Sequence, residues 1–421
     1  MYPRSLAVLL VPFLLFAGGR KPAETGGQVF QQIDSIVKTL STITGLEEEH
    51  PVPYGRMTQP QLRKFLAHRI KTTLKPKDIY ADELTLKLFG MVPDDFDLKQ
   101  STVDLLTEQA AAFYDYQEKK LFLLNTASFT SEETTLAHEL AHALADQHFN
   151  LEKFVEDNDD EDDENLAHTA VVEGQASWVM LAFQMRQQGS KSPPSAALLK
   201  SIEEVPDSTT AEYPVLQQSP LYIQQSLLFP YSEGTKFFDA VYRKMGKAAF
   251  KQVFTEPPKD TAQILHPALY FAHVKPTQPD VPNPHFAGGA KTLTEGSLGE
   301  FDQQVILWRF TGKPNALALS PHVRGSQFRI VQTGKHRKKN SILEYVSEWD
   351  SDGSAAKYFA AYKTVLRKKW KDCDATRNSV KLFAGTGGSG YFVTTVKGRL
   401  VTSIEGIPEE PDWKRLISSG D

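Results

Sequence analysis

Residues 134–148 read TTLAHELAHALADQH, and the predicted fold is built around this stretch. Its small and apolar residues recur at the spacing of a helix that is buried in a protein interior. Thr130 or Ser131 can cap such a helix, and two glutamates follow in the first turn, where the helix dipole favours acidic side chains. The sequence therefore predicts a buried helix that begins near residue 130 and continues through residue 147.

His138, Glu139 and His142 form an HExxH pattern on this helix. Because residues four apart lie on one face of a helix, both imidazoles can reach a single zinc ion. Glu139 lies beside them and can accept a proton from water at the metal. A buried histidine without a partner would be costly, which favours a metal site over two ordinary core histidines. We therefore expect one Zn²⁺ per chain, with Glu139 as the catalytic base.

The third zinc ligand has two candidates, since a catalytic zinc site takes three protein ligands and leaves one position open. His148 completes HExxHxxAxxH, but Ala145 disfavours the positive φ that would return the chain to the metal. On a continuous helix, residue 148 lies six positions after His142, about 240° round the axis. Glu173 lies among apolar residues in a second predicted helix, 166–187, and there a carboxylate needs a positive partner. We favour Glu173 as the third ligand, with His148 as the alternative. If no metal is bound, a salt bridge to Arg or Lys would account for the buried carboxylate of Glu173.

The second predicted helix also contains small residues next to Glu173. Gly174 and Ala176 would let it pack closely against the HExxH helix. Between the two helices, residues 156–164 hold eight acidic side chains, which we interpret as a solvated loop, because the spacing of a calcium-binding loop is absent.

The N-terminus has the pattern of a secretory signal peptide. Arg4 precedes an apolar run at 6–16, and small residues follow at 17–19. The run is shorter than the roughly 20 residues of a membrane-spanning helix, so we expect no stable membrane span after cleavage. Cys373 is the single cysteine, which excludes an intrachain disulfide. The sequence thus predicts an exported protein, periplasmic or secreted.

Composition indicates an ordinary globular protein of 421 residues with 40% hydrophobic and 24% charged residues. A net charge of −5 argues against nucleic acid as a partner. Gly385 to Gly390 match GxGxxG, but a predicted strand and not a helix follows, so we interpret this stretch as a hairpin turn.

Periodicity and breaker residues predict an α+β fold with two domains. A mostly helical catalytic domain contains a small β-hairpin, and a smaller α+β domain of unknown role follows it. The expected boundaries are a signal peptide at 1–19, a catalytic domain at 20–275, a Pro/Gly-rich linker at 276–297 and the α+β domain at 298–421. Within the catalytic domain we expect a helical layer at 28–112, the metal-site core at 113–187 and further helices at 220–272.

A hairpin, an HExxH helix and a distant glutamate together resemble the gluzincin type of zincin metallopeptidases. HELAHALAD is similar to the helix of thermolysin-like enzymes, including Asp146. The chain also resembles a group of exported bacterial proteins of unassigned function that share TLAHEL-HAL-DQH and a later EG-A motif. The likeness to gluzincins covers about residues 113–185. It departs from thermolysin at Val172 and Ser177, which stand where those enzymes have Asn and Asp.

This resemblance implies a zinc peptidase acting on a peptide or protein. The strand at 121–124 would be the sheet edge along which an extended peptide lies. Asp146 and Ser177 are then the candidates for supporting the ligand histidines. The resemblance also implies a Tyr or His that donates to the oxyanion, for which Tyr231, His266 and His168 are the candidates.

The sequence therefore predicts an exported zinc metallopeptidase. The leading alternative is a catalytically inactive zincin-like protein that binds peptides or envelope partners. A purely structural zinc site is disfavoured, because no cysteine lies nearby to close it. Substrate preference and oligomeric state do not follow from the sequence.

Overall fold

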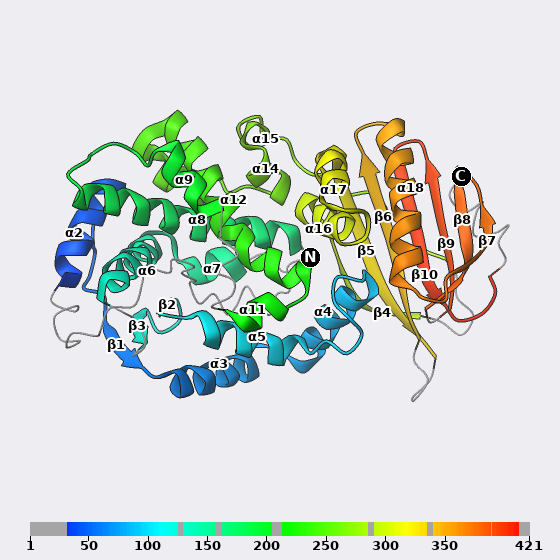
Figure 1. Cartoon of the computed structure of the whole chain (residues 1–421), viewed down its shortest axis with the longest axis horizontal. Coiled ribbons are helices and arrows are strands. Elements are labelled where there is room, and N and C mark those ends of the chain that lie inside the picture. Colours follow the sequence, from blue (N-terminus) through cyan, green and yellow to red (C-terminus); the bar gives the residue numbers. More distant parts are fainter. Residues whose placement is uncertain are drawn as a thin grey trace.

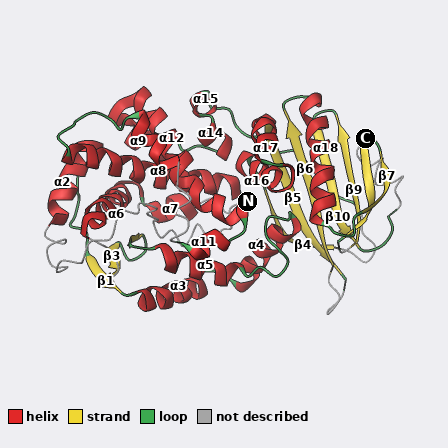
Figure 2. Cartoon of the chain, viewed as in Figure 1, coloured by secondary structure: helices red, strands yellow, loops and turns green. Residues whose placement is uncertain are grey.

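The computed structural model describes residues 32–124, 129–156, 162–203, 213–284, 290–334, 340–388 and 390–411. A helical part with a small sheet lies beside a part built on a large sheet (Figures 1 and 2). The predicted α+β fold is confirmed. The predicted signal peptide lies outside the described residues. Within them, no helix combines the length and apolarity needed to cross a membrane.

The helical part contains most of the helices and three short strands. Apolar residues at helical spacing account for them, as in α2, where Ile33, Ile36, Val37, Leu40 and Ile43 are all buried. Its helices are α2 (Ile33–Thr44), α3 (Gln59–Thr73), α4 (Pro76–Leu88), α5 (Leu98–Gln109), α6 (Phe129–Phe149), α7 (Leu151–Glu156), α8 (Asp162–Gln187), α9 (Ala196–Glu203), α11 (Pro214–Gln218), α12 (Leu221–Met245), α13 (Ala249–Thr255), α14 (Thr261–Leu265) and α15 (Pro267–Phe271). Its strands are β1 (Tyr54–Met57), β2 (Ala112–Asp115) and β3 (Lys120–Leu124).

The small sheet has the order β1-β3-β2, so the predicted edge strand at 121–124 is central. β2 and β3 form the expected antiparallel hairpin, but β1 pairs in parallel with β3 on its other side. β1 escapes sequence prediction because YGRM lacks an apolar alternation and half of it is exposed. The expectation that 121–124 offers a free edge to a peptide is therefore wrong, and β2 is the edge strand that contacts α6.

The two long helices α8 and α12 cross at a point where both have glycine. A methyl group on Gly174 would lie 2.1 Å from the carbonyl carbon of Gly234, and one on Gly234 would lie 2.2 Å from the carbonyl oxygen of Ala170. The prediction that Gly174 allows close packing on the HExxH helix is therefore corrected: it allows close packing on α12.

The C-terminal part is a seven-stranded sheet in the order β4-β5-β6-β10-β9-β8-β7, with α18 lying across it (Figure 1). Stacked aromatic rings join the two, for example Tyr358 of α18 on Trp349 of β6, with centroids 4.2 Å apart. The elements are β4 (Ala290–Gly296), α16 (Glu300–Thr311), α17 (Lys313–Leu319), β5 (Val323–Thr333), β6 (Asn340–Trp349), α18 (Asp352–Lys369), β7 (Asp374–Asn378), β8 (Leu382–Gly387), β9 (Gly390–Lys397) and β10 (Leu400–Ile407).

Two predictions about this part have opposite outcomes. The GxGxxG stretch is a hairpin, as expected, with Gly387 paired to Gly390. The predicted linker at 276–297 is partly wrong, because its last residues form β4 and pair with β5. Glycine and threonine in AKTLTEG hide this mostly exposed edge strand from a periodicity argument.

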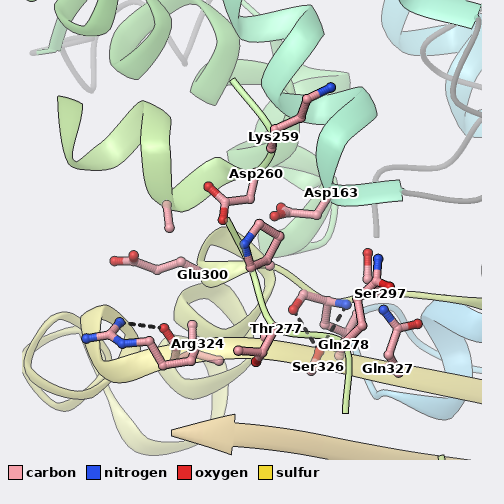
Figure 3. A pocket seen from close by; sticks show the side chains of 16 residues that line it. Asp163, Lys259, Asp260, Thr277, Gln278, Ser297, Glu300, Arg324, Ser326 and Gln327 are labelled. Carbon is pink, nitrogen blue, oxygen red and sulfur yellow. Dashed lines mark hydrogen bonds between the residues drawn. The ribbon is translucent and has the colours of Figure 1, made fainter. Parts of the chain in front are cut away.

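A buried polar junction joins the two parts of the molecule (Figure 3). Asp163, at the start of α8, accepts hydrogen bonds from Thr261 N and Oγ1, at 3.0 and 2.6 Å. The same Thr261 Oγ1 accepts from Phe301 N in α16. Asp162 and Asp163 are 4% and 5% exposed, so the solvated-loop prediction is wrong for this end of the acidic run. Burial, together with the charges of Asp302 and Asp260, raises the pKa of Asp163 to about 8.

Candidate metal centre

Helices α6 and α8 bring His138, His142 and Glu173 together in the interior. Glu173 Oε2 lies 3.2 Å from His138 Nε2 and 3.4 Å from His142 Nε2, and the two Nε2 atoms are 3.0 Å apart. The histidines are fully buried, and Glu173 is 1% exposed. The spacing of four on α6 places the two imidazoles on one face, as predicted. These three side chains form the group of potential metal ligands found among the described residues.

The three donor atoms fit a zinc ion. A tetrahedral zinc with ligands at about 2.0–2.1 Å separates those ligands by about 3.3 Å, close to the observed 3.0–3.4 Å. His138, His142 and Glu173 also supply the nitrogen and carboxylate donors that zinc prefers.

The pKa shifts favour the protonation states that a metal requires. Burial lowers the pKa of His138, so its imidazole stays neutral. Burial alone would raise the pKa of Glu173, but the positive charge of His142 and His138 in their protonated forms and their hydrogen bonds outweigh it and lower this pKa to about 2, so without a metal the carboxylate is stabilised by a proton on the histidine pair. Neutral imidazole and ionised carboxylate are the metal-binding forms.

Glu139 is fixed beside this group by the small sheet. Its Oε2 accepts a hydrogen bond from Tyr114 N, an outward-facing amide of β2, at 2.9 Å. Its Oε1 is buried and has no hydrogen-bond partner in the described part of the chain. Burial, followed by the negative charge of Glu173, raises the pKa of Glu139 well above its usual value. One oxygen is thus anchored, and the other is left to exchange a proton.

Two tyrosines lie against the histidines. Tyr231 of α12 stacks on His138, with ring centroids 6.1 Å apart, so the structure brings this predicted candidate to the site. Tyr116, just after β2, meets His142 edge-on with centroids 6.0 Å apart. Sequence reasoning missed Tyr116, because its position in a hairpin turn carries no periodic or motif signal.

The side chains expected to support the histidines have other partners. Asp146 accepts from Tyr114 Oη at 2.9 Å and from Leu151 N at 2.8 Å, and Lys119 Nζ lies 2.9 Å from it. It therefore ties the hairpin to α6. Ser177 is buried one turn after Glu173 on α8. Nδ1 of both ligand histidines lacks a hydrogen-bond partner within the described ranges, so neither Asp146 nor Ser177 supplies the expected support.

Three predicted histidines make their contacts elsewhere. His148 Nε2 lies 2.8 Å from the carbonyl of Glu47, because α6 continues to Phe149 and turns this side chain away from the metal group. His168 Nδ1 bonds the carbonyl of Phe154. His266 bonds Glu300 at the junction with α16.

No protein-family model, curated protein or solved structure matches this chain significantly.

Proposed function

We propose that this protein is a zinc-dependent peptidase whose metal ligands are His138, His142 and Glu173. The observation that carries the proposal is the buried triangle of donor atoms with Glu139 anchored beside it. A purely structural metal site does not require a carboxylate like Glu139, which is held by one oxygen while the other has no hydrogen-bond partner among the described residues.

The chain's own residues supply the proton transfers. When bound, zinc would lower the pKa of a water molecule and polarise the scissile carbonyl. Glu139 Oε1 accepts a proton from the attacking water, and the same oxygen then delivers it to the nitrogen of the leaving amine. The Tyr114 amide holds Oε2 throughout, so Glu139 keeps its orientation while its charge changes. An extended peptide would run beside β2, which takes the place expected of 121–124.

Export to the periplasm or the exterior is part of the proposal. It is supported by Arg4 and the apolar run at 6–16.

The complete burial of the metal ligands favours one alternative, a zincin-like protein that binds peptides or envelope partners without hydrolysing them. Glu139 discriminates between the two, since a binding protein needs no base there.

Zinc content per chain tests the ligand set. We expect one zinc per wild-type chain, loss of zinc in Glu173→Ala and retention in His148→Ala, the matched control. Loss only in His148→Ala would refute the assignment.

Cleavage of an unfolded protein such as reduced casein tests the activity. Glu139→Gln should bind zinc normally and cleave at least 100-fold more slowly than wild type. Equal rates in the wild type and the variant would favour the binding protein.

A further inference from the structure

The hydroxyl of Tyr116 is a buried hydrogen-bonding group beside the candidate metal ligands. The side chain follows β2, and its ring lies edge-on to His142 and packs on Tyr114 at 5.8 Å. Its Oη is buried and has no hydrogen-bond partner among the residues that the structure describes. A buried polar group without a partner is destabilising, so such a group is most simply explained by a ligand that is bound during function.

The surroundings of this hydroxyl indicate what that ligand is. In the part of the chain that the structure describes, two more buried oxygens without a hydrogen-bond partner belong to the same candidate metal centre, namely Glu139 Oε1 and Glu173 Oε1. An ordinary tyrosine has a pKa of about 10, so the phenol of Tyr116 carries its proton at neutral pH and can act as a hydrogen-bond donor.

We propose that Tyr116 is a catalytic residue that donates a hydrogen bond to the substrate's carbonyl oxygen as that oxygen gains negative charge. The proton stays on Oη, and the bond strengthens as the charge develops. This assignment rests on the proposed function. The donor to the oxyanion thus comes from the β2–β3 hairpin, which also holds Glu139 through Tyr114 N. We favour Tyr116 over Tyr231, because the ring of Tyr231 lies nearly parallel to that of His138, at 25°.

Binding of acetohydroxamate to the full chain loaded with Co²⁺ tests this role without a substrate. The d–d absorption of Co²⁺ reports first the metal affinity and then the acetohydroxamate affinity of wild type, Tyr116→Phe and Tyr231→Phe. We expect Tyr116→Phe to keep the Co²⁺ affinity of the wild type and to bind acetohydroxamate about 10-fold or more weakly, the effect of losing a hydrogen bond to a charged group. Tyr231→Phe should change the acetohydroxamate affinity less than threefold.

Thermal unfolding separates this role from a structural one. In the metal-free protein, Tyr116→Phe should leave the Tm unchanged or raise it, because the variant removes an unpartnered hydroxyl. A lower Tm with unchanged acetohydroxamate affinity would overturn the proposal, as would a larger loss of affinity in Tyr231→Phe. Weaker Co²⁺ binding in Tyr116→Phe would make the phenol a metal ligand and would also overturn it. No Co²⁺ binding by the wild type would instead refute the metal centre, and this assignment with it.

Discussion

The crossing of α8 and α12 offers a sharp test of how the fold holds the site. α8 carries Glu173, and α12 carries Tyr231. At their closest approach, Gly174 faces the backbone of Gly234 with no room for a methyl group. We predict that Gly174→Ala and Gly234→Ala each destabilise the protein, although alanine favours helix.

The magnitude follows from the geometry. A methyl on Gly174 would lie 2.1 Å from a backbone carbon, whereas ordinary Cβ contacts begin at 3.4 Å, so the helices must separate by about 1.3 Å. Forcing extra atoms into a packed core typically costs about 1–3 kcal/mol. We take the upper end, because the obstacle is the backbone of Gly234, which cannot change rotamer to relieve the clash. The higher helix propensity of alanine offsets about 1 kcal/mol. The net loss is about 2 kcal/mol for each substitution.

Urea unfolding followed by far-UV circular dichroism measures this loss. Gly353→Ala is the matched control, since it also lies in a helix, α18, but its nearest obstacle is Ser351 Oγ at 3.9 Å. The control should be neutral or stabilising by up to about 1 kcal/mol. In the double variant Gly174→Ala/Gly234→Ala, one separation of the helices relieves both clashes, so the loss should fall clearly below the sum of the single losses. If Gly174→Ala were as stable as Gly353→Ala, the close-packing argument would be refuted.

Three further predictions concern the metal centre, the junction and a buried ion pair. Zinc at 100 times its Kd should stabilise the wild type by about 2.7 kcal/mol in thermal or urea unfolding; an equal gain in His142→Ala would contradict the site. The pKa of Asp163 is about 8 in the folded protein and 3.8 for an ordinary aspartate, so its stabilising proton is fully effective below pH about 4, and this contribution is lost as the pH rises towards 8. The unfolding midpoint should therefore change less between pH 5 and 8 in Asp163→Asn than in the wild type, and identical profiles would count against the raised pKa. Lys369 contacts Glu405 and the carbonyl of Leu88, so Lys369→Met should cost about 3–5 kcal/mol, because the buried carboxylate of Glu405 loses its positive partner and keeps only the hydroxyls of Tyr362 and Ser403; adding Glu405→Gln should recover part of the loss, and no recovery would argue against the pairing.

The candidate metal centre shows how much a local sequence pattern can predict. His138 and His142 share a face because helical spacing alone places them there. Glu173 could be singled out because a carboxylate among apolar neighbours needs a positive partner. The structure brings it within 3.2–3.4 Å of the histidines. Asp146 illustrates the limit of a resemblance, since its partners are Tyr114, Lys119 and the backbone, which only the folded hairpin brings to it.

Two strands in which apolar and polar residues do not alternate clearly, β1 and β4, could not be predicted from the sequence. β1 and β4 are exposed edge strands, and their order in the sheet depends on partners far away in the sequence. Because β1 pairs with β3, residues 121–124 are no longer at an edge of the small sheet, and β2 is the edge strand beside α6. The expected path of a peptide therefore runs along β2.

The α+β class, the long helices and the pair of histidines with Glu139 follow from the amino-acid sequence, because they depend on periodicity within a single element. Three contacts could be found only in the folded chain: Tyr114 N anchors Glu139, Tyr116 reaches the histidines and Gly174 packs on α12. These contacts join segments whose separation along the chain is closed only by packing, and no local pattern records which surfaces will meet.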